Sequence, residues 1–97
     1  MGLDVGCGNG AFTRAIARFG RPASIDAIDP ESHQIALASD LPKNEGINYQ
    51  VADVTSLPFV PDLFDVITAA LVVNVLLDPP KAVREMCRVS RPGGLVM

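Results

Sequence analysis

The sequence has few cysteines and no cluster of basic residues. Its two cysteines, Cys7 and Cys87, cannot form a disulfide framework and have no histidine or cysteine at metal-ligand spacing beside them. We therefore expect no zinc site and no secreted disulfide scaffold, and we expect a reducing, cytoplasmic environment. The 8 Lys and Arg residues are scattered along a chain whose formal charge is −3, so nucleic-acid binding through a basic face is not expected.

Long hydrophobic runs are also missing. The most apolar stretch covers residues 66–77, is interrupted by Thr68 and Asn74, and ends before Asp78. A membrane-spanning helix needs about 20 apolar residues, so this sequence predicts no membrane partner. A secretory leader is not visible either, because Asp4 and a glycine-rich segment stand where its apolar region would be.

Hydrophobic residues are plentiful and follow a clear pattern. They make up 48% of the 97 residues, which is too apolar for a disordered tail and fits one small domain. Short apolar runs alternate with segments of helical period, as in parallel βαβ units, so the expected fold class is α/β. Strands are expected at 1–5, 23–28, 47–51 and 64–70, with a fifth of three residues ending at 97, and helices at about 11–19, from 30 to 39 and from 79.

Two of the expected helices carry apolar residues on one face, and these faces should pack on the sheet. They are Phe12, Ala15, Ile16 and Phe19 in the first helix, and Val83, Met86 and Cys87 in the third. Asp29-Pro30 and Asp78-Pro79 are each interpreted as an N-cap followed by the first helical residue.

Three glycines, Gly6, Gly8 and Gly10, stand between the first expected strand and the first helix. They let the backbone turn tightly and let a ligand lie against main-chain N–H groups at a helix N-terminus. With Ala11 as the third small residue, the segment also satisfies the dinucleotide fingerprint, so a dinucleotide is one of two candidate ligand classes. Asp29 suits either class, because a carboxylate can accept from both hydroxyls of a ribose, and it also suits a helix cap.

The remaining blocks carry a resemblance to a known family. In order along the chain they are residues 4–10, Ile28-Asp29-Pro30, Ala52-Asp53-Val54 with Leu57-Pro58-Phe59, Phe64-Asp65-Val66-Ile67, and Glu85 with Arg88-Val89 leading to Arg91-Pro92-Gly93-Gly94. Together they resemble the class I S-adenosylmethionine-dependent methyltransferases, most closely the small-molecule branch often called type 11. The resemblance implies a Rossmann-like, doubly wound parallel sheet of strand order 3-2-1-4-5. It also implies S-adenosylmethionine as cofactor and methyl transfer to a small-molecule acceptor by in-line displacement.

The resemblance also implies a set of cofactor-binding residues. In this sequence they are Asp4, Gly6, Cys7, Gly8, Gly10, Asp29, Pro30, Asp53, Val54 and Ala70. The loop and the acid before it would hold the methionyl end, and the strand-two acid would hold the ribose. Asp53 would accept the adenine amine, the Val54 N–H would meet a ring nitrogen, and residues 69–71 would line the floor.

Other polar residues receive no chemistry from the sequence. No catalytic base or metal ligand is assigned, and His33 is interpreted as a solvent-facing helical residue. Asp65 is expected to be structural, and Arg88 and Arg91 are expected on the solvated end of a helix, where cations suit its dipole. Residues 78–80 resemble an Asp-Pro-Pro motif of nucleic-acid amino-methyltransferases, but their position favours a helix start.

The sequence starts within its first expected strand and stops within its fifth. We therefore expect residues 1–97 to form a single but incomplete S-adenosylmethionine-binding core that lacks the family's antiparallel C-terminal strands. The exposed edges of such a sheet predict self-association. Two alternatives remain open: an NAD(P)-binding fragment of an oxidoreductase, against which Asp53 and the Pro-Gly-Gly block argue, and a truncated remnant without catalytic activity.

Overall fold

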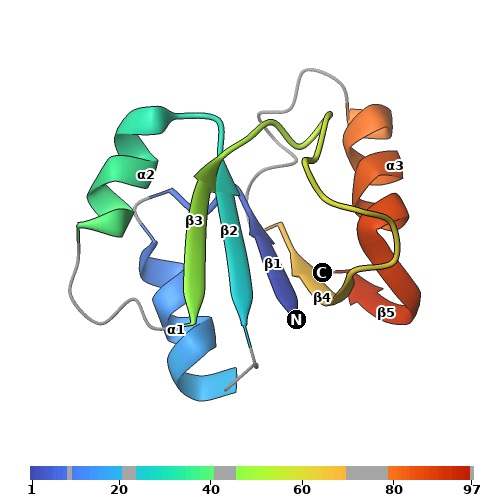
Figure 1. Ribbon diagram of the computed structural model, residues 1–97, viewed down its shortest axis with the longest axis horizontal. Coiled ribbons are helices and arrows are strands. Elements are labelled where there is room, and N and C mark those ends of the chain that lie inside the picture. The colour runs from blue at the N-terminus through green and yellow to red at the C-terminus, as the bar shows by residue number, and fades with distance from the viewer. Residues whose placement is uncertain (9, 21–23, 41–45, 70–78, 97) are drawn as a thin grey trace.

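The fold is a five-stranded parallel sheet flanked by helices (Figure 1). The computed structural model describes residues 1–8, 10–20, 24–40, 46–69 and 79–96. The sheet has the order β3-β2-β1-β4-β5, and every neighbouring pair is parallel, which confirms the expected class and strand order. In chain order the elements are β1 (Gly2–Val5), α1 (Ala11–Gly20), β2 (Ile25–Asp29), α2 (Ser32–Ser39), β3 (Ile47–Val51), β4 (Phe64–Thr68), α3 (Pro79–Val89) and β5 (Ser90–Val96).

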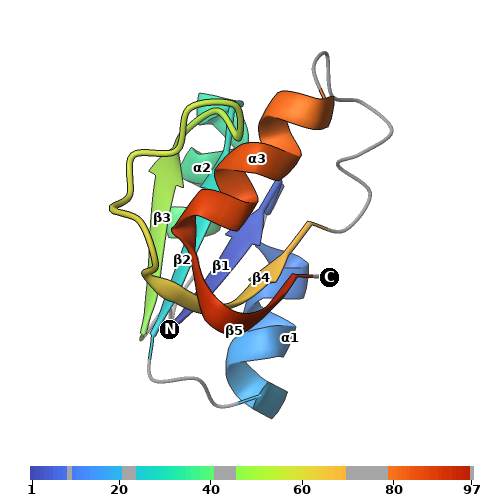
Figure 2. The ribbon, with the colours of Figure 1, turned by 90° about the vertical axis from the view of Figure 1, so that its right-hand side faces the viewer.

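The helices lie on both faces of this sheet. From β1 the chain moves to β2 and β3 in one direction, and later from β4 to β5 in the other. Since parallel crossovers are right-handed, helices that connect strands in opposite directions fall on opposite faces. Figure 2 shows α3 in front of the sheet with α1 and α2 behind it. Among the described residues, no helix is long and apolar enough to cross a membrane.

Each face of the sheet has its own hydrophobic core. Side chains alternate along a strand, so Leu3 and Val5 of β1 face α3, whereas Asp4 between them faces α1. The core on the α3 face consists of Leu3, Val5, Ile28, Val54, Leu57, Phe64, Ile67, Ala82, Met86 and Val89. The smaller core under α2 consists of Cys7, Ala27 and Ile35, with Ile47 and Tyr49 packed against it.

The helical faces that pack on the sheet differ from the expected ones. In α1, Phe12 is 51% exposed and the fully buried residue is Thr13, because Thr13 donates a hydrogen bond to the buried carboxylate of Asp4. Ala15 and Ile16 are half-buried, and the side chain of Phe19 lies outside the described residues. The expected position of Phe12 was therefore wrong.

In α3 the packed stripe is Ala82, Met86 and Val89, while Val83 and Cys87 are exposed. The half-buried Glu85 lies beside this stripe. A pattern of apolar residues does not detect it, because its side chain is charged. This acid is tolerated there because its carboxylate accepts the Leu57 N–H and pairs with a neighbouring arginine. Only Met86 of the expected face was right.

The start of α2 differs from the expected one, whereas the start of α3 is confirmed. Asp29 is the last residue of β2, and α2 begins at Ser32 with Glu31 as its N-cap residue. Pro30 is therefore not the first helical residue. Helix α3 does begin at Pro79 as expected, while Asp78 lies outside the described residues.

Strand β3 matches its expected range, and the other four strands differ from theirs. Strands β1 and β2 differ by one or two residues at their ends. Strand β4 ends at Thr68, and Val66 is 37% exposed, so β4 is not covered on both faces. Strand β5 begins at Ser90, and the Pro-Gly-Gly block lies inside it instead of forming a turn before a three-residue strand. Phe64 and Val66 of β4 pair with Ser90 and Leu95. The extra residues of β5 bulge between these pairs, and Gly93 takes a φ of +81° there.

Candidate functional site

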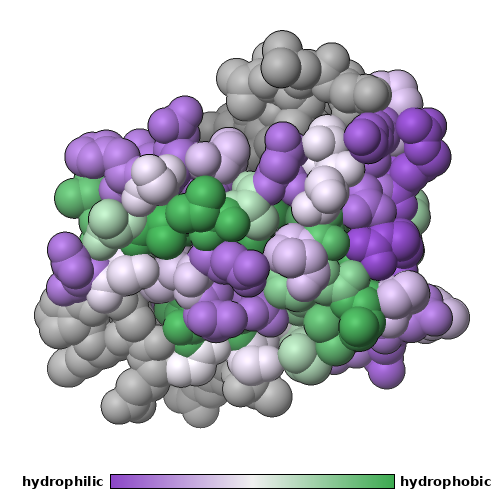
Figure 3. All heavy atoms as spheres, turned by 45° about the horizontal axis from the view of Figure 1, so that its top comes forward, coloured by the Kyte–Doolittle hydropathy of each residue, from purple (hydrophilic) through white to green (hydrophobic). Residues whose placement is uncertain are grey.

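The sequence-predicted site residues that the structure describes gather mainly at the carboxyl ends of three neighbouring strands. The glycine loop follows β1, Asp29 ends β2, and Asp53 follows β3. All three strands point to the upper edge of Figure 1. Ligands of open parallel sheets bind at this edge near the point where the strand order reverses, which here lies between β1 and β4. Figure 3 brings the edge forward and shows hydrophobic patches separated by hydrophilic ones, with hydrophilic residues gathered on the side of α3.

The glycine loop is folded tightly against the end of β2. Gly6, Gly8 and Gly10 all have positive φ angles, of 74°, 55° and 88°, which glycine adopts without steric cost. The N–H groups of Gly6 and Cys7 both donate to the Ile28 carbonyl, at 2.8 and 2.9 Å, and the Gly10 N–H donates to the Cys7 carbonyl at 3.0 Å. These donors serve the fold of the loop itself.

Gly8 and Gly10 differ in the space that is available for a side chain. A Cβ built on Gly8 would have nothing within 4 Å, whereas a Cβ on Gly10 would lie 2.7 Å from the Tyr49 hydroxyl and 2.9 Å from Arg14 Nη1. A side chain at Gly10 would therefore require the Tyr49 and Arg14 side chains to move. Gly8 is the glycine at which another molecule can approach the backbone closely.

Asp29 connects the loop to the next two elements. It is only 8% exposed. Its Oδ2 accepts the Gly8 N–H at 3.0 Å, and its Oδ1 accepts the Glu31 N–H at 2.9 Å. Its backbone carbonyl accepts the Ala52 N–H at 3.2 Å, just before Asp53. One residue thus fixes the glycine loop, the entry into α2 and the end of β3 relative to one another.

Asp4 lies deeper in the molecule, on the face covered by α1. Its two carboxylate oxygens accept the hydroxyls of Thr13, at 2.6 Å, and of Thr68, at 3.0 Å. Burial raises the pKa of this carboxyl, and the two hydroxyl hydrogen bonds act in the opposite direction. The sequence analysis missed both threonines. The signal that could have found them is the rule that a buried acid needs donors, applied to the neighbouring strand and helix.

Asp53 and Val54, which follow β3, differ in exposure. Asp53 is exposed, and Thr55 donates both its N–H and its hydroxyl to the same oxygen, Oδ1, at 2.9 and 2.8 Å. These donors lower the pKa of Asp53. The Val54 side chain is buried in the core on the α3 face, so the backbone is anchored next to an exposed carboxylate.

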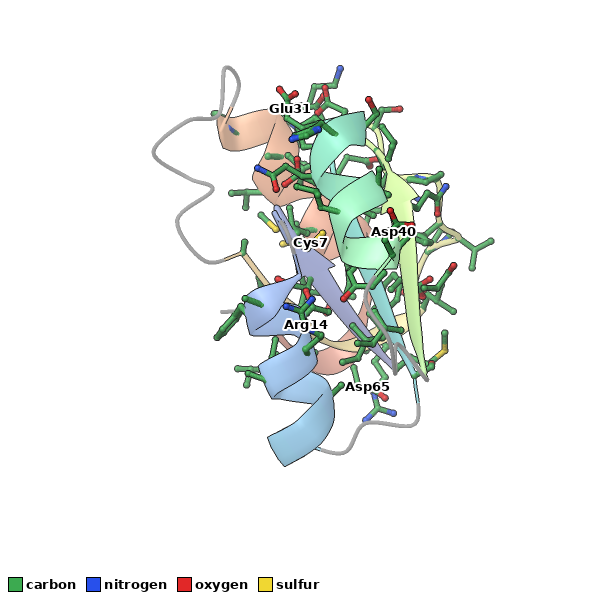
Figure 4. All side chains as sticks on the ribbon, turned by 90° about the vertical axis from the view of Figure 1, so that its left-hand side faces the viewer. Cys7, Arg14, Glu31, Asp40 and Asp65 are labelled. Carbon is green, nitrogen blue, oxygen red and sulfur yellow. The ribbon has the colours of Figure 1, made fainter. Side chains whose placement is uncertain are left out.

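Cys7 is a buried residue that packs under α2. Its side chain is buried under α2 and donates a weak hydrogen bond to the Gly8 carbonyl at 3.6 Å. Burial raises its pKa to about 12, and the negative charges of Asp4 and Asp29 add to this effect. Figure 4 shows Cys7 beside α2, and Asp65 away from it near the lower ends of the strands.

Pro30 directly follows Asp29 at this edge and is exposed, as is His33 in the first turn of α2. Asp65 lies away from the edge, where it pairs with the Met1 amine and with Arg91, and Ala70 lies outside the described residues. In the described part of the chain, no group of three or more His, Cys, Asp or Glu residues could hold a metal ion.

Comparison with known proteins agrees with this architecture. The family model described as "Methyltransferase domain" matches residues 3–97. The chain is 32% identical over 95 residues to the ubiquinone biosynthesis O-methyltransferase of Methylobacterium nodulans, covering 96% of this chain and 37% of that protein.

Solved structures with the same fold include two with high TM-scores. The structure of the [4+2]-cyclase SpnF has a TM-score of 0.90 at 33% identity and covers 98% of this chain and 37% of that one. An S-adenosylmethionine-dependent methyltransferase from Mesorhizobium loti has a TM-score of 0.86 at 28% identity, with 96% and 43% covered. The chain thus spans well under half the length of each of these relatives. On the match of the family model to almost its whole length, the chain belongs to the methyltransferase domain family.

Proposed function

We propose that this chain is the S-adenosylmethionine-binding core of an enzyme that transfers a methyl group to a small-molecule acceptor. The observation that carries the proposal is the row of contacts along the carboxyl edge, from Gly8 to Asp29 Oδ2 and from the Asp29 carbonyl to Ala52. Gly8, the Asp29 carboxylate and the exposed Asp53 follow one another along this row. Membership of the methyltransferase domain family supports the same reading.

The residues present fit such a cofactor by their chemistry. Nothing lies within 4 Å of a Cβ position on Gly8, which allows an extended chain to pass close to the backbone. Asp29 brings a carboxylate to the adjoining strand end for two ribose hydroxyls, and Asp53 brings an exposed acceptor suited to an amine on adenine. The loop, Asp29, Pro30, Asp53 and Val54 are the described residues that would hold the cofactor, with Ala70 added by the sequence.

The bound cofactor would supply an electrophilic methyl group on a sulfonium. The described residues bind and orient, which is the main requirement of an in-line displacement, since alignment of the reactants accounts for much of the acceleration. Asp4 contributes indirectly, because its bonds to Thr13 and Thr68 join β1 to α1 and β4 beneath the glycine loop. We assign no residue of this chain as a catalytic base.

The acceptor class, the location and the assembly are also part of the proposal. The name of the Methylobacterium nodulans relative, a ubiquinone biosynthesis O-methyltransferase, supports a small organic acceptor. Two free thiols, Cys7 and Cys87, support a reducing cytoplasm. Leu95 and Val96 on the edge strand β5 are exposed, which supports self-association through that edge.

A matched pair of variants tests the proposed cofactor site. Asp29→Asn should weaken S-adenosylmethionine binding by about tenfold, the effect of losing roughly one hydrogen bond to a ligand. Asp26→Asn is the control, because Asp26 lies on the same strand and bonds only Asn48 among its recorded partners; its affinity should equal that of the wild type. Isothermal titration measures both.

Three results of this titration would count against the proposal. They are equal losses in the two variants, binding of NAD in place of S-adenosylmethionine, and no binding of S-adenosylmethionine to the wild-type chain. Because one structural relative is a [4+2]-cyclase, family membership alone does not establish methyl transfer. Transfer itself needs a separate assay, with radiolabelled cofactor and quinol acceptors.

A further inference from the structure

The sequence assigned no hydrogen-bond partners to Arg88 on α3, but in the structure its side chain makes several hydrogen bonds. Its Nε and Nη2 donate to Glu85, at 2.6 and 3.1 Å. Its Nη1 donates to the Phe59 carbonyl at 2.9 Å, and Nη2 also donates to the Leu57 carbonyl at 3.0 Å. Glu85 in turn accepts the Leu57 N–H at 2.9 Å. We call this set of contacts the Glu85–Arg88 clamp.

The clamp joins α3 to the segment that connects β3 to β4. This segment starts with Asp53 and Val54, the expected adenine contacts, and runs through Leu57 to Phe59. The Ser56 N–H donates to the Asp53 carbonyl at 3.0 Å, so Asp53 is one short turn away from the clamped residue Leu57. Only a few backbone bonds therefore separate the clamp from Asp53.

The geometry of the clamp requires an arginine. A guanidinium is planar and presents donors in fixed directions, so it can grip one carboxylate with two nitrogens while reaching two carbonyls. The hydrogen bond to Glu85 raises the pKa of Arg88, and the same bond lowers the pKa of Glu85. Both groups remain charged across the physiological range, and the clamp therefore stays closed there.

The clamp adds little to stability for the number of contacts that it makes. The side chains of Arg88 and Glu85 are 35% and 20% exposed, and partly exposed ion pairs contribute little to the free energy of folding. The segment is already anchored by the buried side chains of Val54 and Leu57. What the clamp fixes in addition is the path of the backbone over residues 57–59.

The contacts also differ from those of a helix-terminal cation. Such a cation would bond the last carbonyls of its own helix. Arg88 instead reaches carbonyls 29 and 31 positions away in the sequence. Arg88 does lie in the last turn of α3, as expected, but its side-chain partners belong to the segment that starts with Asp53.

We propose that Glu85 and Arg88 are positioning residues for the adenine end of the cofactor site. By holding the backbone of Leu57 and Phe59, they set the position at which Asp53 and the Val54 N–H meet a purine ring. This inference rests on the proposed function. It adds that recognition of the purine base depends on α3, an element that does not itself reach the ligand.

A double-mutant cycle in the 97-residue chain tests the inference. Arg88→Lys keeps the charge but cannot make the bridging contacts, and it should weaken S-adenosylmethionine binding by about tenfold, the factor for roughly one lost hydrogen bond. Arg91→Lys is the matched control, because Arg91 pairs with Asp65 in β4 and has no recorded contact with residues 53–59; the affinity of this variant should not change. In an Asp53→Asn background, Arg88→Lys should weaken binding by less than about twofold, since the two changes act through one contact.

The outcomes separate this inference from the proposed function. If the wild-type chain binds no S-adenosylmethionine, the proposed function fails and the inference with it. If the wild type binds and Arg88→Lys binds equally well, or if its loss is unchanged in the Asp53→Asn background, only the positioning role fails.

A further variant covers the case in which Arg88→Lys does not fold. Glu85→Gln retains an oxygen for the Leu57 N–H and removes only the charge that orients Arg88. It should weaken binding by about threefold, since a neutral partner gives a weaker hydrogen bond than a charged one. The amide NMR signals of residues 53–57 should shift with it before any cofactor is added. Unchanged signals and unchanged affinity would overturn the proposal.

Discussion

The glycine loop and the segment from Asp53 to Phe59 reach the same edge of the sheet by different means. The loop is shaped by its own glycines and by backbone hydrogen bonds to β2. The segment is shaped by buried side chains and by the clamp from α3, which reaches it from about thirty residues further along the chain. A site can therefore combine one part that is specified locally with another that depends on distant contacts.

The largest expected effect concerns the difference between two glycines of the loop. Gly10→Ala should lower the free energy of unfolding by about 3 kcal/mol, from left-handed strain plus overpacking, because its Cβ would lie 2.7 Å from the Tyr49 hydroxyl. Gly8→Ala should cost only about 1 kcal/mol, from the strain alone. Urea unfolding of both variants gives the comparison. Equal losses would show that packing at Gly10 is not the constraint described here.

A second comparison is between a buried and an exposed acid. Thr13→Val removes the hydroxyl that donates to the buried Asp4 and should cost about 2 kcal/mol, because water cannot replace it. Thr55→Val removes the hydroxyl that donates to the exposed Asp53 and should cost about 0.5 kcal/mol, because water can. Chemical denaturation measures both changes. A larger loss at Thr55 would reverse the assignment of the two regions.

The same acids should respond to pH with opposite signs. Burial raises the pKa of Asp4 above its ordinary 3.8, so the folded chain binds this proton more tightly and loses stability as the pH rises from 3.8 through the raised pKa. The Thr55 hydrogen bonds lower the pKa of Asp53 below 3.8, so its contribution is present above 3.8 and is lost as the pH falls through the lowered pKa.

Unfolding midpoints across a pH series can measure these signs. Compared with the wild type, Asp4→Asn should become relatively more stable as the pH rises above 3.8. Asp53→Asn should become relatively less stable as the pH rises from below the lowered pKa to 3.8. Parallel curves for the wild type and both variants would contradict these assignments.

The smallest effect is chemical and should leave the fold intact. Cys7 is buried with a pKa raised to about 12, while Cys87 on α3 is exposed. Iodoacetamide on the native chain should therefore label Cys87 and leave Cys7 unmodified. Peptide mapping by mass spectrometry reads this directly, and labelling in urea supplies the control. Fast native labelling of Cys7 would mean that the glycine loop opens.

Local features of the fold could be predicted from the sequence. Strand β3 was placed over its observed range of Ile47–Val51, and α3 begins at Pro79 as expected. The glycine loop was recognisable because positive φ angles leave glycine as the suitable residue. The strand order came from the resemblance, since periodicity does not say which strands are neighbours.

The features that failed depend on partners distant in the sequence. Helical periodicity gives the spacing of buried residues but not which face is buried. The face of α1 is fixed by Thr13 reaching Asp4, and that of α3 by Glu85 reaching Leu57. The start of α2 was misplaced because Asp29 is held by Gly8 and remains in β2. In each case a buried or partly buried polar contact decides the outcome.

The central claim is that the carboxyl edge of β1, β2 and β3 binds S-adenosylmethionine. A two-dimensional amide NMR titration of the chain, with S-adenosylmethionine and then NAD, tests it most directly. The account predicts that signals of the glycine loop, Asp29, Asp53 and Val54 shift with S-adenosylmethionine alone, while those of Asp65 and Arg91 at the opposite edge stay in place. Shifts with NAD alone, or none at these residues with either ligand, would contradict it.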